Sequence, residues 1–96
     1  RQYQDWGRIQ SLWKEAGERN IKPDHGLEYL PFIEAFARQN DWETASVLTR
    51  AANKLTSDAK SSYCQLWKRL SIDTPASPQK TAALAKINLS LACAIP

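Results

Sequence analysis

The stretch LEYLPFIEAFARQNDWETASVLTRAA, residues 27–52, holds two helical patterns on either side of the polar break RQND. In the first pattern, apolar residues recur at steps of three and four, which places them on one helix face: Tyr29, Phe32, Ile33 and Phe36. Pro31 is compatible with a helix only in its first turn, where a missing N–H costs no helical hydrogen bond. This helix is therefore predicted over about residues 29–39.

A second helix is predicted after the break. Asp41 is a natural N-cap, because its carboxylate can accept a hydrogen bond from an unpaired N–H of the first turn. Small and medium apolar residues then form a narrow stripe at helical spacing: Ala45, Leu48, Ala52 and Leu55. This helix is predicted over about residues 41–55, and Asn40 can adopt the left-handed conformation that the connecting turn requires. The whole stretch is thus predicted to be one helical hairpin.

The remainder of the chain shows three further helical patterns, predicted over about residues 2–18, 58–71 and 78–92. Ser57 is the predicted cap of the fourth helix, while Ser77 caps the fifth and Pro78 occupies its first position. No segment alternates between apolar and polar residues, so we expect no strands. The predicted fold class is all-α: about five helices in antiparallel hairpins, forming one domain over residues 1–96.

The helices also repeat in sequence. Asp5-Trp6 recurs thirty-six positions later as Asp41-Trp42, and Leu12, Leu48 and Leu84 share this offset. A period in the middle thirties is typical of helical-hairpin repeats. The hairpin at residues 27–52 resembles a tetratricopeptide repeat, with Ala45 and Ala52 seven residues apart where small side chains let helices approach closely. The chain departs from that pattern at Asn40, where the turn usually has glycine, and at Ser57, where proline often ends the repeat.

Composition excludes several classes of function. The chain has 13 basic and 10 acidic residues without a basic face, so we predict no nucleic-acid partner. No apolar run approaches the length that spans a bilayer, so no membrane span is expected in this segment. Because the chain contains no methionine, we expect it to be a fragment of a longer protein whose targeting or membrane segments lie elsewhere.

No grouping of residues indicates catalysis. His25 is the only histidine and is predicted to serve in a turn or as an N-cap. Cys64 has no neighbouring base, and the carboxylates of Glu28 and Glu34 would point in different directions on a helix. Asn88-Leu89-Ser90 matches an N-glycosylation acceptor by chance, inside a helical pattern. We therefore predict no catalytic residue, no cofactor and no metal site in this segment.

The cysteines and tryptophans leave alternatives open. Cys64 and Cys93 are an even pair that composition alone allows to be either a disulfide or two reduced thiols; a bond would close a loop of about 30 residues and stabilise the fold by roughly 3 kcal/mol. The four tryptophans, Trp6, Trp13, Trp42 and Trp67, are assigned to core and edge packing. The alternative is a groove of exposed aromatic rings that binds a peptide or glycan, and Trp13 is then the binding-surface candidate.

Several segments resemble one family. EYLPFIEAFARQNDW at residues 28–42, LTRAA at 48–52, YCQLWKRL at 63–70 and the late cysteine Cys93 resemble the soluble C-terminal region of bacterial pilin-type protein O-oligosaccharyltransferases. These enzymes belong to the O-antigen ligase and polymerase superfamily of membrane proteins. The resemblance covers roughly residues 27–93, and none of the matching segments is catalytic in that family.

The resemblance implies a function and a location. The parent would be an inner-membrane glycosyltransferase that carries out protein O-glycosylation, moving a lipid-linked oligosaccharide to Ser or Thr of exported proteins. This domain would then be a non-catalytic periplasmic module that docks on or stabilises the membrane-embedded part of its parent, with an acceptor protein or peptide as a further partner. The periplasm would also allow Cys64 and Cys93 to oxidise. The alternatives are a tetratricopeptide-like adaptor that binds a partner peptide, and a structural cap on a larger helical array.

Overall fold

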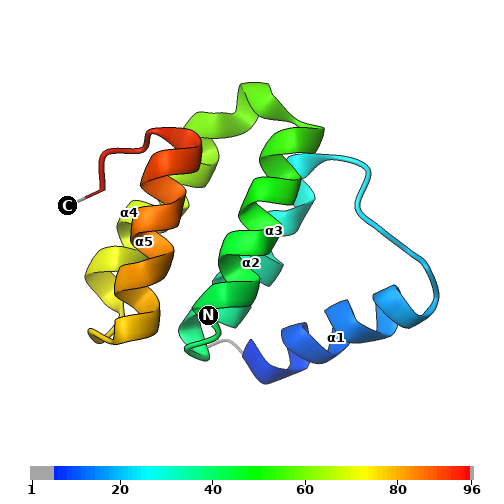
Figure 1. Cartoon of the computed structure of the whole chain (residues 1–96). Helices are drawn as coiled ribbons and strands as arrows, with labels where there is room; N and C mark the ends of the chain where they lie inside the picture. The colour runs from blue at the N-terminus through cyan, green and yellow to red at the C-terminus, as the bar shows by residue number, and fades with distance from the viewer. Residues whose placement is uncertain (1–5, 96) are drawn as a thin grey trace.

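Two adjacent helices, α2 (Leu30–Arg38) and α3 (Trp42–Leu55), form the central hairpin of the computed structural model, which describes residues 6–95 (Figure 1). Within residues 6–95 every regular element is helical, which confirms the predicted all-α fold class. Pro31 lies in the first turn of α2, where its missing N–H is tolerated. Ala45 and Ala52 are fully buried at the contact between the two helices and the rest of the core.

The turn between α2 and α3 has the geometry that its sequence predicts. Asn40 adopts a left-handed backbone conformation with φ of 63°, and the Asp41 N–H donates to the Phe36 carbonyl at 2.8 Å. The Asp41 carboxylate accepts from the Thr44 N–H at 3.3 Å and caps α3. Both predictions, the N-cap at Asp41 and the left-handed turn at Asn40, are confirmed.

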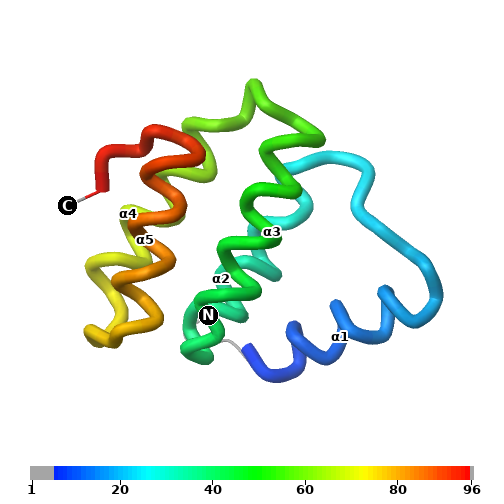
Figure 2. Tube along the Cα trace, viewed as in Figure 1, coloured from blue at the N-terminus to red at the C-terminus, as the bar shows by residue number. Residues whose placement is uncertain are grey.

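A second hairpin, formed by α4 (Lys60–Asp73) and α5 (Pro78–Leu91), stacks on the first. Helix α3 packs against α5, and α2 packs against α4, so the two hairpins lie side by side (Figure 2). Ser77 caps α5 by accepting the Lys80 N–H at 3.1 Å, as predicted. Helices α3 and α5 begin at residues 42 and 78, which is the thirty-six-residue offset of the sequence repeat.

Lys80 joins the two helices of the second hairpin. Its side chain is buried, and Nζ donates to the carbonyls of Ser71 and Thr74, each at 2.8 Å. These carbonyls lie at the C-terminal end of α4, where the helix leaves its last acceptors without internal partners. The ammonium group therefore caps α4 from within α5 and stabilises the hairpin.

Helix α1 (Trp6–Glu18) is attached differently from the other four. It packs on α2, yet none of its residues is fully buried. Residues 19–25 form the loop that connects it to the hairpins (Figure 1). The predicted beginning of this helix near residue 2 lies outside the described residues. Its apolar stripe is thus only partly covered by the domain.

Two short 3-10 helices, η1 (Gly26–Tyr29) and η2 (Ser57–Ala59), precede α2 and α4 and shift their beginnings. The prediction that Ser57 caps the fourth helix was wrong: Thr56 precedes η2, and no side chain caps it. The reason is a set of long-range contacts at Thr56, whose hydroxyl accepts the Gly26 N–H at 2.8 Å and whose carbonyl accepts the Tyr63 hydroxyl at 2.9 Å. These contacts hold the chain in a tight turn, so α4 begins at Lys60 and extends to Asp73.

The core is joined by buried polar groups as well as apolar contacts. Trp67 is fully buried and donates from Nε1 to the Thr49 hydroxyl at 2.8 Å, and this hydroxyl donates to the Ala45 carbonyl at 2.8 Å. The rings of Trp42 and Trp67 lie 5.6 Å apart between centroids. The predicted packing role of these two tryptophans is confirmed, and Thr49 satisfies the indole N–H that burial would otherwise leave without a partner.

Gly26 provides the first test of the fold. A methyl group on its Cα would lie 2.7 Å from the Ala52 carbonyl and would overlap the Tyr63 hydroxyl, so Gly26→Ala is expected to lower the free energy of unfolding by about 2–3 kcal/mol. Gly17 is the matched control, because nothing lies within 4 Å of its added methyl. Gly17→Ala in α1 is expected to be neutral or to stabilise by about 0.5–1 kcal/mol. Urea unfolding followed by circular dichroism measures both, and equal effects would contradict this account.

Tyr63 provides the second test, because its single O–H is shared between the Ala52 carbonyl at 3.0 Å and the Thr56 carbonyl at 2.9 Å. Burial, with smaller contributions from Asp58 and Tyr29, raises the pKa of Tyr63 above its usual 10.0. The folded state therefore keeps the proton longer than the unfolded state, so this contribution to stability is present below pH 10 and is lost as the pH rises above it. Tyr63→Phe is expected to lower the free energy of unfolding by about 1–2 kcal/mol at neutral pH. Because the variant has no phenol to ionise at this position, it is also expected to lose less stability than the unsubstituted chain as the pH rises above 10. Thermal unfolding across neutral and alkaline pH tests this, and an unchanged alkaline slope would contradict it.

Candidate functional site

Trp13 fixes α1 to the central hairpin and forms the middle of the candidate site. Its ring lies 4.9 Å from the Phe32 ring and 5.6 Å from the Tyr29 ring, both tilted by about 50°. The side chain is only partly buried, since one part of it contacts the core and the remainder faces two cavities. The binding-surface candidate of the sequence analysis thus lies at the junction between α1 and the hairpin.

The two cavities share Trp13, Ile21 and Lys22, and we refer to them together as the Trp13 groove. The larger one, of about 460 Å³, is completed by Ala16, Pro23, Glu28 and Phe32. The smaller one, of about 230 Å³, lies toward α3 and is completed by Gly17, Tyr29, Leu48 and Ala51. Apart from Lys22 and Glu28, every described residue that lines the groove is apolar, aromatic or glycine. Such a surface suits an apolar side chain far better than a charged ligand.

Backbone hydrogen bonds at the end of α1 hold one wall of the groove. The Ile21 N–H donates to the Ala16 carbonyl at 2.8 Å, and the Asn20 N–H donates to the Gly17 carbonyl at 3.1 Å, with Asn20 in the left-handed conformation. This is a Schellman-type helix end, in which asparagine replaces the usual glycine. It turns the chain so that Ile21 lies against the groove while 58% of its surface stays exposed.

His25 and Glu28 hold the other end of the same loop. The Leu27 N–H donates to His25 Nδ1 at 3.1 Å, and Glu28 Oε1 accepts from the backbone N–H groups of Asp24 and His25 at 2.9 and 3.4 Å. Together these bonds form a capping box at the beginning of η1. The predicted N-cap role of His25 is confirmed, and the Glu28 carboxylate has a structural partner.

A network of charges lies on the neighbouring face, between α2 and α4. Arg38 donates to the Glu34 carboxylate at 2.8 Å, lies 3.6 Å from Asp73, and places its guanidinium 5.3 Å from the centre of the Trp6 ring. Arg69 approaches the same Glu34 carboxylate at 3.6 Å. The network links α1, α2 and α4, and it borders a cavity of about 370 Å³ whose walls include Glu34, Gln65 and Arg69.

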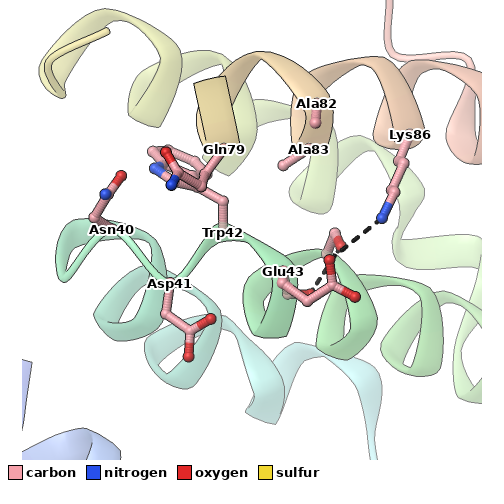
Figure 3. A pocket seen from close by; sticks show the side chains of 9 residues that line it. Asn40, Asp41, Trp42, Glu43, Gln79, Ala82, Ala83 and Lys86 are labelled. Atoms are coloured by element: carbon pink, nitrogen blue, oxygen red, sulfur yellow. Dashed lines mark hydrogen bonds and ion pairs between the residues drawn. The ribbon is translucent and has the colours of Figure 1, made fainter. Parts of the chain in front are cut away.

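Another cavity, of about 200 Å³, lies between the beginning of α3 and α5 (Figure 3). Lys86 reaches across it and approaches the Glu43 carboxylate at 3.4 Å, while Trp42 closes its floor with 1% of its surface exposed. Glu43 and Lys86 are themselves largely exposed, so water screens their attraction. The ion pair joins the two hairpins at their surface, and the other acidic residue that lines the cavity, Asp41, accepts the Thr44 N–H as the cap of α3.

The tryptophans do not form one aromatic groove. Trp42 and Trp67 are inside the core, Trp6 is paired with Arg38, and Trp13 alone lines the apolar groove. The alternative in which several exposed rings build a continuous stacking surface is therefore wrong for Trp42 and Trp67. These two rings contact each other, and Trp67 also donates to the Thr49 hydroxyl. A sequence pattern does not show such partners.

The two cysteines form a disulfide in the structure. Cys64 on α4 is bonded to Cys93, which lies beyond the end of α5, with 5.3 Å between their Cα atoms. Cys93 is buried and Cys64 is half-buried. The bond ties the end of the chain to the second hairpin.

Asn88 has a partner that the sequence analysis missed. Its amide nitrogen donates to the Ile95 carbonyl at 2.9 Å, and its amide oxygen accepts the Ile95 N–H at 2.9 Å. The acceptor-like sequence Asn88-Leu89-Ser90 thus has its asparagine engaged in a structural contact. A pair seven residues apart across a helix end leaves no periodic signal, so the pattern could not have revealed it.

Across residues 6–95 no set of three or more His, Cys, Asp or Glu side chains is arranged to hold a metal ion. None of the helices in this range is both long and apolar enough to cross a membrane. Comparison with protein-family models, with curated proteins and with solved structures found no match.

The disulfide leads to a prediction for the intact chain. Because the bond closes a loop between residues 29 apart, the Cys64→Ser/Cys93→Ser variant is expected to lose about 3 kcal/mol of unfolding free energy. Urea unfolding of the oxidised and substituted chains measures the difference. Intact mass before and after reductant reports the bond itself, and two thiols that alkylate in the unreduced protein would contradict the assignment.

Proposed function

We propose that this chain is a docking domain that binds its partner through the Trp13 groove. The observation that carries the proposal is the incomplete burial of α1, none of whose residues is fully buried although the helix has an apolar stripe. Ile21, which lines the groove, exposes 58% of its surface, and Leu12, the residue before Trp13 in α1, exposes 47%. Contiguous exposed apolar surface with cavities in it is typical of an interaction site.

We further propose that the partner is the membrane-embedded part of a longer chain, and that the parent is a protein O-oligosaccharyltransferase. Two observations support this assignment. The segments that resemble such enzymes fall on the α2–α3 hairpin, α4 and the terminal cysteine, which are the elements that form the folded body. The Cys64–Cys93 bond suits an oxidising compartment such as the periplasm. In this proposal the domain positions or stabilises the enzyme, and catalysis belongs to another part of the parent.

The second candidate function is a tetratricopeptide-like adaptor that binds a partner peptide. The observation in its favour is the cavity between α2 and α4, whose walls combine Leu30, Pro31 and Leu66 with polar and charged groups. Its charges are paired, since Glu34 contacts both Arg38 and Arg69. Among residues 6–95, no aromatic side chain lines this cavity, whereas the Trp13 groove has three, so the groove is the stronger binding surface.

The proposal is tested in the full-length parent enzyme by Trp13→Ala and, separately, by Ile21→Glu. Both substitutions change the groove, and Ile21 is exposed enough that its replacement spares the core. Transfer of the glycan to an acceptor protein, measured by the mobility shift of that acceptor, is expected to fall by about tenfold in each variant, as for a central interface residue.

Leu89→Ala on α5 is the matched control, because Leu89 is 88% exposed and remote from the groove in the chain. Its transfer activity is expected to remain within about twofold of the unsubstituted enzyme. Circular dichroism of the isolated domain verifies folding of each variant. Normal transfer by both groove variants would overturn the docking role, and an upstream reading frame without membrane spans would overturn the assignment to an oligosaccharyltransferase.

A further inference from the structure

Residues 92–95, which follow α5, fold back against the second hairpin in an unusual conformation. Ala92 ends α5 with φ of 56°, and Ala94 has φ of 58°. Cys93 lies between them and is 6% exposed, and Ile95 is 5% exposed. A buried terminal segment with two left-handed alanines needs specific contacts to hold it, because Cβ crowds the backbone in that conformation.

Asn88 supplies such contacts without any involvement of sulfur. Its side chain exchanges two hydrogen bonds with the backbone of Ile95, both at 2.9 Å, while its own carbonyl accepts the Ala92 N–H at 2.9 Å. Cys93 is thus held between two backbone positions that Asn88 fixes. The burial of Ile95 adds an apolar contact at the end of the segment.

The disulfide attaches residues 92–95 to α4. Cys64 belongs to α4, whereas Asn88 belongs to α5, so the two attachments join the segment to different helices of the hairpin. Either attachment opposes the tendency of Ala92 and Ala94 to leave the left-handed region. The Asn88 contacts therefore remain available when the sulfurs are reduced.

We propose that Asn88 is the positioning residue of the Cys64–Cys93 bond. Its side chain keeps residues 92–95 docked after reduction, so that the Cys93 thiol stays beside Cys64 and the bond re-forms readily. Residues 92–95 are then attached to the hairpin in two ways. The disulfide depends on redox conditions, whereas the hydrogen bonds to Asn88 do not. This inference is independent of the docking role of the Trp13 groove.

The equilibrium of thiol–disulfide exchange with oxidised glutathione measures how well the folded chain positions its two thiols. One cysteine thiolate attacks the glutathione disulfide, forms a mixed disulfide and releases one glutathione thiol; the other cysteine then displaces the second. The protein loses two protons and two electrons, and the glutathione disulfide gains them as two thiols. The equilibrium constant of this exchange has the units of concentration, and it measures how closely the folded chain holds its two thiols together.

The experiment compares this equilibrium constant among full-length variants of the chain. Asn88→Ala removes both bonds to Ile95 and is expected to lower the constant by about tenfold. Asn88→Asp keeps the acceptor for the Ile95 N–H but loses the amide donor, so its constant is expected to lie between those of the alanine variant and the unsubstituted chain. Ser90→Ala, at an exposed position of the same helix, is the control and is expected to stay within about twofold. A constant for Asn88→Ala within twofold of the unsubstituted chain would overturn the proposal.

A second measurement separates positioning from general stability. In the Cys64→Ser/Cys93→Ser chain, the Ile95 amide is expected to be protected from hydrogen exchange, because it still donates to Asn88. Adding Asn88→Ala is expected to abolish that protection while the exchange of amides in α3 and the helical circular dichroism stay unchanged. If the Ile95 amide exchanges without protection in the chain that lacks cysteines but retains Asn88, only the disulfide holds residues 92–95. That result would refute the positioning role of Asn88.

Discussion

The Tyr63 hydroxyl is the contact on which the arrangement of the hairpins depends. It donates to the carbonyls of Ala52 and Thr56 at the C-terminal end of α3, where the Ala52 carbonyl also accepts the Thr56 N–H at 2.8 Å. Thr56 in turn accepts the Gly26 N–H through its own hydroxyl, and the missing side chain of Gly26 leaves space for the Tyr63 hydroxyl. One side chain of α4 therefore fixes the end of α3, the turn before α4 and the 3-10 helix that leads into α2.

The remaining core follows from this junction. With α4 anchored beside α3, Trp67 reaches Thr49 one turn before Ala52, and its ring meets Trp42 at the beginning of α3. Helix α5 then completes the layer by packing on α3, and Lys80 closes the end of α4. Helix α1 has no part in this sequence of contacts. It is attached to the hairpin through the aromatic contacts of Trp13 and the pairing of Trp6 with Arg38, which is why cavities remain on both sides of Trp13.

The sequence predicts the local features of this fold well, because helical periodicity and capping depend on residues a few positions apart. The caps at Asp41 and Ser77, the left-handed turn at Asn40 and the N-cap at His25 are all of this kind. The errors occur where a partner is distant in sequence. Ser57 has the composition of a cap, but contacts from Gly26 and Tyr63 decide the conformation at Thr56.

The candidate site shows the same limit. The sequence analysis names Trp13 as the binding-surface candidate, but the groove also needs Ile21 and Pro23, which belong to no periodic pattern. Asn88 was set aside as a chance motif because nothing in a helical pattern indicates a bond to a backbone group seven residues later. The burial of Lys80 likewise follows from the carbonyls at the end of another helix. Sequence patterns find residues that face the same way, and they do not find which distant group a polar side chain meets.

The two ends of the described chain differ in how firmly they are held, and the difference bears on function. At the C-terminal end, a disulfide and the Asn88 amide fasten residues 92–95 to two different helices. At the other end, α1 has no fully buried residue and leaves apolar side chains in contact with water. A domain with a purely structural role would be more stable if its own residues covered α1. The incomplete cover of α1 is the basis of the docking role proposed above, in which a partner would complete the packing of this helix.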